Sequence, residues 1–183
     1  MKTISANILL DSKIILEKAN ISAGMKIADL GCGGHGYFVF PLAQAVGRAG
    51  TVYAVDILKI MLENIRRKAN IETYPNVKTV WSDLEFFGAT KIETMSLDKA
   101  LLINVLFQSK KRINVLREAI RMLKKNGELI IIDWNEQAIP FGPDLEDRVK
   151  FNFLKEGAHK LGVELKEEFS AGQYHHGLIF KKI

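Results

Sequence analysis

The sequence predicts an α/β fold: a doubly wound, Rossmann-like sandwich around a mostly parallel seven-stranded sheet with an antiparallel C-terminal hairpin. Three observations support this prediction. Apolar segments of strand length alternate with amphipathic segments of helix length along most of the chain. A glycine-rich loop follows the first strand, within 29-DLGCGGHGYFVFPLA-43. The last two strands have no helix between them, and strands joined by so short a link must pair antiparallel.

The first half of the chain alternates helix and strand. The expected elements are a helix at 13–19, a strand at 26–31, a helix at about 37–47, a strand at 51–57, a helix at 58–69 and a strand at 77–83. Asp11 or Ser12 can cap the first helix, and Gly47 ends the second. The strand at 51–57 is nearly continuously apolar, as expected of a parallel strand covered on both faces. One face of the third helix carries Leu58, Met61, Leu62, Ile65 and Ala69.

The second half continues the alternation and ends in the hairpin. The expected elements are a strand within 97–107, a helix that stops at Asn126-Gly127, a strand at 128–134, a loop at 135–144, a helix at about 145–161, and the hairpin strands 163–169 and 177–183. The inward helix faces are expected to carry Ile113, Leu116, Ile120 and Leu123, and then Leu145, Val149, Leu154, Ala158 and Leu161. A doubly wound sheet binds its ligand at the carboxyl ends of its strands.

Composition predicts one soluble domain. A chain of 183 residues with 48% hydrophobic residues fits a single compact domain, 1–183, in which residues 1–24 form a short helical cover. One cysteine, no leader pattern and no long apolar run lead us to expect a cytoplasmic protein without a membrane span. The net charge of +5 permits an anionic partner. The basic clusters at 66–68, 110–112 and 124–125 lie at helix ends, where we expect them to be solvated.

The glycine loop predicts a nucleotide site, and two acidic residues indicate which nucleotide. Gly31, Gly33 and Gly36 have G-x-G-x-x-G spacing, which lets a backbone approach a ligand closely. Asp56 follows at the end of the second strand, where a carboxylate can accept both ribose hydroxyls. Asp29, two residues before the loop, would repel the pyrophosphate of NAD. It would attract the ammonium and sulfonium groups of S-adenosylmethionine, which is therefore the expected cofactor.

Five segments carry a resemblance to a known family, in family order and at family spacing. They are 26-KIADLGCGGHG-36, 51-TVYAVDI-57, 81-WSDLEFF-87, 98-DKALLINVLF-107 and 122-MLKKNGELIIIDW-134. On these segments the chain resembles class I S-adenosylmethionine-dependent methyltransferases, closest in style to the small-molecule enzymes of ubiquinone and menaquinone biosynthesis. The resemblance runs from about residue 12 to the end, so it implies a single class I methyltransferase domain.

The resemblance implies a role for each cofactor-binding position. Gly31, Gly33 and Gly36 would admit the methionine part, with Asp29 near its amino group. Asp56 would hold the ribose, and Ile57 would pack on the adenine. Asp83 would accept from the adenine amino group, with Leu84 beside the ring. Asn104 would lie under the cofactor and face the substrate.

No catalytic residue can be assigned from the sequence. Methyl transfer from a sulfonium mainly requires that the nucleophile and the methyl group be held in line. A general base is needed only where the nucleophile must lose a proton, and His35, His175 and His176 are candidates for it. Cys32 is the only cysteine and lies in the cofactor loop, which argues against a cysteine nucleophile. No histidine or cysteine spacing predicts a metal site.

The expected function is in-line methyl transfer to a small molecule, and two alternatives stay open. The charge allows an RNA methyltransferase acting on rRNA or tRNA. A non-catalytic S-adenosylmethionine-binding regulator or partner protein would show the same cofactor residues. Tyr74 and Lys78 make a Y-x-x-x-K pair like that of short-chain dehydrogenases, but an NAD(P)-linked oxidoreductase is disfavoured. Pro75 and Asn76 lie between the two residues, ahead of a strand, so no helix brings their side chains onto one face. The sequence does not indicate the acceptor, the methylated atom or the oligomeric state.

Overall fold

A seven-stranded sheet forms the centre of the protein in the computed structural model, which describes residues 9–137 and 141–183. The strand order is β3-β2-β1-β4-β5-β7-β6. The strands are β1 (Lys26–Leu30), β2 (Thr51–Asp56), β3 (Val77–Trp81), β4 (Leu97–Ile103), β5 (Leu123–Trp134), β6 (Val163–Ser170) and β7 (His175–Lys182). The first five strands pair parallel, and β7 pairs antiparallel with both β5 and β6. The predicted fold class is confirmed, including the reversed hairpin.

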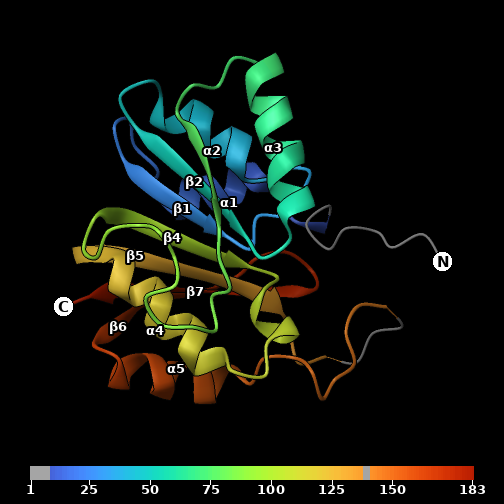
Figure 1. Ribbon diagram of the computed structural model, residues 1–183. Helices are drawn as coiled ribbons and strands as arrows, with labels where there is room; N and C mark the ends of the chain where they lie inside the picture. The colour runs from blue at the N-terminus through green and yellow to red at the C-terminus, as the bar shows by residue number, and fades with distance from the viewer. Residues whose placement is uncertain (1–8, 138–140) are drawn as a thin grey trace.

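Helices cover both faces of the sheet (Figure 1). They are α1 (Ser12–Lys18), α2 (Val39–Val46), α3 (Lys59–Ile71), the 3₁₀ helix η2 (Leu106–Gln108), α4 (Arg112–Met122) and α5 (Phe151–Lys160). Buried residues of α1, α2 and α3 share one apolar cluster with one face of the strands. Those of α4 and α5 share a second cluster with the other face. This is the two-sided burial expected of a largely parallel sheet.

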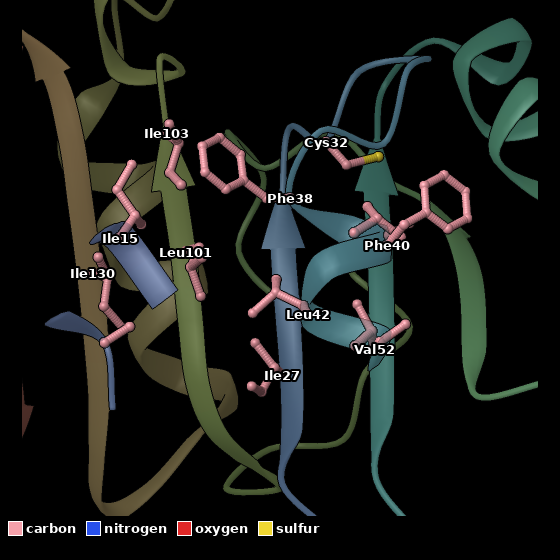
Figure 2. Packing of buried hydrophobic residues seen from close by; sticks show 14 of the residues in the cluster. Ile15, Ile27, Cys32, Phe38, Phe40, Leu42, Val52, Leu101, Ile103 and Ile130 are labelled. Carbon is pink, nitrogen blue, oxygen red and sulfur yellow. The ribbon is translucent and has the colours of Figure 1, made fainter. Parts of the chain in front are cut away.

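The first cluster reaches from α1 to the glycine loop. Figure 2 shows Ile15 of α1 near Ile130 of β5, and Phe38, just beyond the loop, beside Ile103 of β4. All four side chains are almost completely buried. Asp11 caps α1 as predicted, because its side chain accepts a hydrogen bond from the Lys13 amide. The core packing therefore fixes both the N-terminal helix and the loop against the sheet.

The helix predicted to stop at Asn126-Gly127 ends earlier. α4 finishes at Met122, and β5 begins at the next residue, Leu123. Leu123 pairs with Leu97, and the register then shifts before Glu128 pairs with Lys99. Asn126 adopts a positive φ of 63° within this irregular stretch. The Asn-Gly pair thus accommodates a bulge in a strand instead of ending a helix. Ile113, predicted to face inward, is 40% exposed.

The helix predicted over 145–161 is shorter at its start. α5 begins at Phe151, and residues 145–148 form a turn and a bend before it. Leu145 is therefore exposed, whereas Val149, Leu154 and Ala158 are buried as expected. Leu58 is similarly exposed, because it precedes α3 as its N-cap residue. Apolar spacing alone overextends these two helices, since it does not show where the chain must turn.

The strand order reverses between β1 and β4. The chain moves outward from β1 through β2 to β3, and then returns to place β4 against the other side of β1. A doubly wound sheet binds its ligand in the crevice at such a switch point, outside the carboxyl ends of the strands. The glycine loop, the residues after β2 and Asn104 all follow strands at this edge.

Candidate cofactor site

The three glycines of the loop have positive φ angles but different surroundings. The values are 81° at Gly31, 62° at Gly33 and 63° at Gly36. A Cβ atom on Gly31 would lie 2.5 Å from a methyl carbon of Val105, and one on Gly36 would lie 2.3 Å from the Phe40 ring. A Cβ on Gly33 would meet nothing within 4 Å. Packing therefore requires Gly31 and Gly36, whereas Gly33 leaves open space beside the backbone.

Asp56 shapes the loop through its two carboxylate oxygens. Oδ2 accepts a hydrogen bond of 2.9 Å from the Gly33 amide, and Oδ1 accepts one of 2.9 Å from the Leu58 amide. Each oxygen keeps further acceptor capacity, since an ionised carboxylate offers about four lone-pair sites. The next residue, Ile57, is 52% exposed and presents an apolar surface at the end of β2.

One oxygen of the buried Asp29 carboxylate lacks a hydrogen-bond partner among the described residues. This oxygen is Oδ2, and the residue is 2% exposed. Burial, and to a lesser extent the negative charge of Asp56, raises the pKa of Asp29 to about 7. A carboxylate in this position is stabilised by a cation placed next to it. The orphaned oxygen and the open space at Gly33 fit the amino-acid end of S-adenosylmethionine.

The segment after β3 carries Asp83 and Leu84 and is held from α4. Asp83 Oδ1 accepts a hydrogen bond of 2.9 Å from the Glu85 amide, and Leu84 packs against the second apolar cluster. The Glu118 carboxylate accepts from the amides of Gly88 and Thr90, at 2.7 and 2.9 Å. The charged side chain of α4 thus fixes the course of this loop.

Glu118 holds its charge although it is completely buried. Its carboxylate forms an ion pair of 2.8 Å with Arg121. Burial alone would raise the pKa of Glu118, but the hydrogen bonds from Arg121 and from the Gly88 and Thr90 amides lower it to about 2. The sequence analysis did not identify this residue. In the sequence, Glu118 could have been recognised as a glutamate within the apolar face of a predicted helix.

Asn104 joins the carboxyl end of β4 to the start of β7. It adopts a positive φ of 57°, and its side chain is buried. His175 Nε2 lies 3.0 Å from Asn104 Oδ1. The ring of His175 lies against that of Trp134, the last residue of β5, at a centroid distance of 4.5 Å. The fold therefore brings together three residues that are far apart in the sequence.

Only one of the three candidate histidines lies at this position. His175 is 2% exposed, and burial, followed by the positive charge of Arg148, lowers its pKa to about 4. His176 lies on the opposite face, where its Nε2 is 2.8 Å from Glu168 and its ring contacts Phe151. His35 is exposed at the rim of a surface hollow of about 680 Å³ alongside α3.

Asp133, the last residue but one of β5, supports the site from the other face. It is fully buried and accepts hydrogen bonds from the amides of Leu106, Phe107 and Trp134. Burial raises its pKa to about 7, although these amides act in the opposite direction. The carboxylate anchors the turn that begins at Val105, next to Gly31. In the sequence, Asp133 could have been recognised as an acidic residue inside the apolar strand 128–134.

Arg148 holds the loop that follows β5. Its guanidinium donates to the carbonyl oxygens of Pro143, Asn135 and Gln137, and lies over the Trp134 ring. A buried arginine bonded to several backbone carbonyls fixes the described parts of the loop, 135–137 and 143. Residues 138–140 of the predicted loop, like residues 1–8 of the predicted cover, lie outside the described residues. Nothing in the sequence analysis singled out Arg148.

Two further findings concern the described residues alone. Residues 9–137 and 141–183 contain no cluster of three or more histidine, cysteine, aspartate or glutamate side chains that could hold a metal ion. None of the helices in these ranges is long and apolar enough to cross a membrane.

Together, the sheet order, the reversed last strand and the acidic loop edge define the chain as a Rossmann-like protein of the methyltransferase type. A family model described as a methyltransferase domain matches residues 21–172, and the chain belongs to this family. The match covers most of the chain and includes every position predicted to bind the cofactor.

Individual relatives agree with the family. The chain is 29% identical to the demethylmenaquinone methyltransferase of Lactococcus lactis over 117 residues, 64% of this chain and 45% of that protein. It is 36% identical to an aklanonic acid methyltransferase of a Streptomyces species over 65 residues, 36% of this chain and 29% of that protein. The chain thus spans less than half the length of these curated relatives. A solved methyltransferase structure from Aquifex aeolicus superimposes with a TM-score of 0.86 at 22% identity, covering 97% of this chain and 92% of that one.

Proposed function

We propose that this protein is an S-adenosylmethionine-dependent methyltransferase that acts on a small molecule by in-line methyl transfer. The observation that carries the proposal is Asp29, whose buried carboxylate has an orphaned oxygen in the strand that leads into the open turn at Gly33. An ammonium group satisfies that oxygen, whereas a pyrophosphate is repelled by it. S-adenosylmethionine supplies the activated methyl group, so the protein has to bind it and orient the acceptor.

Each predicted cofactor residue has a proposed task. The loop of Gly31, Gly33 and Gly36 holds the methionine part, with Asp29 at its ammonium. Asp56 accepts from the ribose hydroxyls with the lone pairs that its amide partners leave unused. Ile57, Leu84 and Asp83 form the adenine site, and Asn104 lies beneath the cofactor. The exposure of Ile57 supports this assignment, because an adenine ring would cover it.

The N-terminal segment is proposed as a cover of the same domain. The Tyr37 hydroxyl, just after the glycine loop, donates a hydrogen bond of 2.7 Å to the Leu10 carbonyl. Ile15 of α1 is buried in the core next to it. These contacts hold the segment beside the proposed cofactor site. The single cysteine, which is buried, supports a reducing compartment such as the cytoplasm.

Relatives that act on small molecules support the acceptor class. The names of both curated relatives give a small-molecule substrate, demethylmenaquinone in one case and aklanonic acid in the other. Part of the basic charge considered for RNA contact is paired within the protein. Lys110 pairs with Asp147, Lys111 with Glu85, and Lys124 with Asp98. These pairs favour a small-molecule acceptor over RNA.

Calorimetry tests the proposal directly. S-adenosylhomocysteine is expected to bind, and NADH is expected to produce no heat of binding. Tight NADH binding without a response to S-adenosylhomocysteine would refute the proposal. A methyl-transfer screen over quinols, amines, thiols and RNA then tests the acceptor class. Binding without transfer to any acceptor would favour the non-catalytic alternative.

A further inference from the structure

A pair of orphaned polar atoms lies beyond the proposed cofactor site. Trp134 Nε1 and His175 Nδ1 are buried, and neither has a hydrogen-bond partner among the described residues. Their rings are adjacent, with planes inclined at 36°. A buried polar atom without a partner costs free energy, so such atoms at a functional edge indicate a ligand. Asp29 Oδ2 is the remaining atom of this kind, and the cofactor accounts for it.

The pair offers one donor and one acceptor. Trp134 Nε1 can only donate. Asn104 Oδ1 accepts from His175 Nε2, so the imidazole carries its proton on Nε2 and leaves a lone pair on Nδ1. Burial and the charge of Arg148 keep the ring neutral at pH 7. A hydroxyl group matches this pair, because its oxygen accepts from the indole and its hydrogen donates to the imidazole.

The pair lies where an acceptor has to approach the cofactor. Trp134 ends β5 and pairs with His175 at the start of β7, at the carboxyl edge of the parallel strands. Side chains alternate along a strand, so Trp134 and His175 face the same way as Ile132 and Ile179, toward the cluster that α1 and α2 cover. Asn104 connects His175 to β4, beside the strand that carries Asp29.

We propose that Trp134 and His175 form the acceptor subsite, and that the acceptor presents a hydroxyl group there. This inference rests on the proposed function. The hydroxyl oxygen forms a bond to the methyl carbon with one of its lone pairs. The bond between that carbon and sulfur breaks, and its electron pair stays on the sulfur. The hydroxyl proton passes to His175 Nδ1. A weak base suffices, because the oxygen becomes cationic as it bonds to carbon and its proton becomes strongly acidic.

The chain contains an internal control for a spectroscopic test. It has two tryptophans, Trp81 and Trp134. Trp81 Nε1 already donates a hydrogen bond of 2.8 Å to the Ile57 carbonyl. The indole N–H resonances of ¹⁵N-labelled protein, saturated with S-adenosylhomocysteine, are followed while phenol is added. Trp81→Phe assigns the two signals. We expect phenol to shift the Trp134 signal and to leave the Trp81 signal in place.

Toluene, which has the same ring and no hydroxyl, is the matched control probe. No movement of the Trp134 signal with phenol, or an equal movement with toluene, would overturn the subsite. Failure of the proposed function and failure of this inference give different results. Absence of S-adenosylhomocysteine binding defeats the proposed function itself. Normal binding without a phenol-specific shift defeats only the inference about Trp134 and His175.

Three variants test the roles of the two side chains. His175→Gln keeps a polar group toward Asn104 and removes Nδ1, and Trp134→Phe keeps an aromatic ring but removes the N–H together with the five-membered ring of the indole. Each is expected to lower kcat/KM for a hydroxyl acceptor by about 10- to 100-fold, with unchanged affinity for S-adenosylhomocysteine. His176→Gln, on the opposite face of the same strand, is the control and is expected to retain activity. Full activity of both subsite variants would exclude the proposed roles.

Discussion

At the scale of single residues, the buried carboxylate of Asp29 couples stability to pH. Its pKa in the folded chain, about 7, is higher than its ordinary value of 3.8. Folding therefore favours the protonated form. The contribution of Asp29 to stability is fully present below about pH 4 and is lost as the pH rises through 7. Binding of a cationic ligand would reverse this loss, because it favours the ionised form.

Asp29→Asn is expected to stabilise the ligand-free protein at pH 8 by about 1 to 4 kcal/mol, and to have little effect near pH 4. The same variant should bind S-adenosylhomocysteine at least 10-fold more weakly, because it removes a charged acceptor. Chemical denaturation at both pH values and calorimetry measure the two effects. Asp144→Asn, which changes an exposed carboxylate, is the control. Equal stability changes at pH 4 and pH 8 would contradict the role of the buried charge.

Substitutions at the loop glycines are expected to affect ligand affinity and folding stability to different degrees. Gly33→Ala should cost only about 1 to 2 kcal/mol, from its positive φ, but should weaken S-adenosylhomocysteine binding, because the new methyl group enters the open turn. Gly36→Ala should cost about 2 to 5 kcal/mol, because its Cβ would overlap Phe40 and Ile65.

Gly24→Ala is the matched control for these two variants. Gly24 has a positive φ of 82° and open space around its Cβ position, but it lies outside the loop. It should lose about as much stability as Gly33→Ala without a change in ligand affinity. Thermal unfolding measures the stability of the three variants, and calorimetry measures their affinity for S-adenosylhomocysteine. Equal affinity in all three variants would contradict the special role of Gly33 in binding.

At the scale of elements, α4 controls a loop that it does not adjoin in the sequence. Glu118 holds the segment at Gly88 and Thr90, close to Asp83 and Leu84. Glu118→Ala is expected to destabilise the protein by about 3 to 5 kcal/mol, because it removes the carboxylate that pairs with Arg121 and leaves two amides without their acceptor. Glu118→Gln should lose less stability and still weaken S-adenosylhomocysteine binding, because the loop is held less firmly.

Denaturation and calorimetry check both Glu118 variants, with Glu63→Gln on the exposed side of α3 as the control. A stability loss with unchanged affinity would show that the loop keeps its shape without the carboxylate. In that case Glu118 would act on the fold and not on the proposed adenine site.

At the scale of the whole molecule, part of the basic charge in the clusters described above is neutralised by ion pairs within the protein. Most of these lysines face a carboxylate of a neighbouring segment. Such pairs leave fewer cations for phosphates. A single-stranded RNA probe is therefore expected to bind no tighter than the non-specific range of about 10⁻⁴ to 10⁻⁶ M at physiological salt. Fluorescence anisotropy at several salt concentrations measures this, and nanomolar RNA binding with a steep salt dependence would support the RNA alternative.

The alternation of elements could be predicted because it depends on local patterns. The apolar run 51–57 predicts a buried strand whatever its neighbours are, and the absence of a helix between 169 and 177 predicts a hairpin. Element ends were less predictable. The stop signal at Asn126-Gly127 lies inside β5, since the pairing of Leu123 with Leu97 extends the strand over it. The start of α5 was wrong because residues 145–148 turn where Arg148 binds loop carbonyls.

Local sequence patterns were sufficient to predict the order of the strands and helices, the glycine loop and the charge of its acidic edge, because each depends on residues close together in the chain. Which glycines are needed for packing, and which histidine contacts Asn104, depends on the packing of distant segments against one another. The contact between Asn104 and His175 joins residues 71 positions apart. Its existence depends on the order β4-β5-β7 and on the face that each side chain takes. Burial then sets the properties of these groups, because the pKa of Asp29 and the unpaired nitrogen of His175 both result from the exclusion of water.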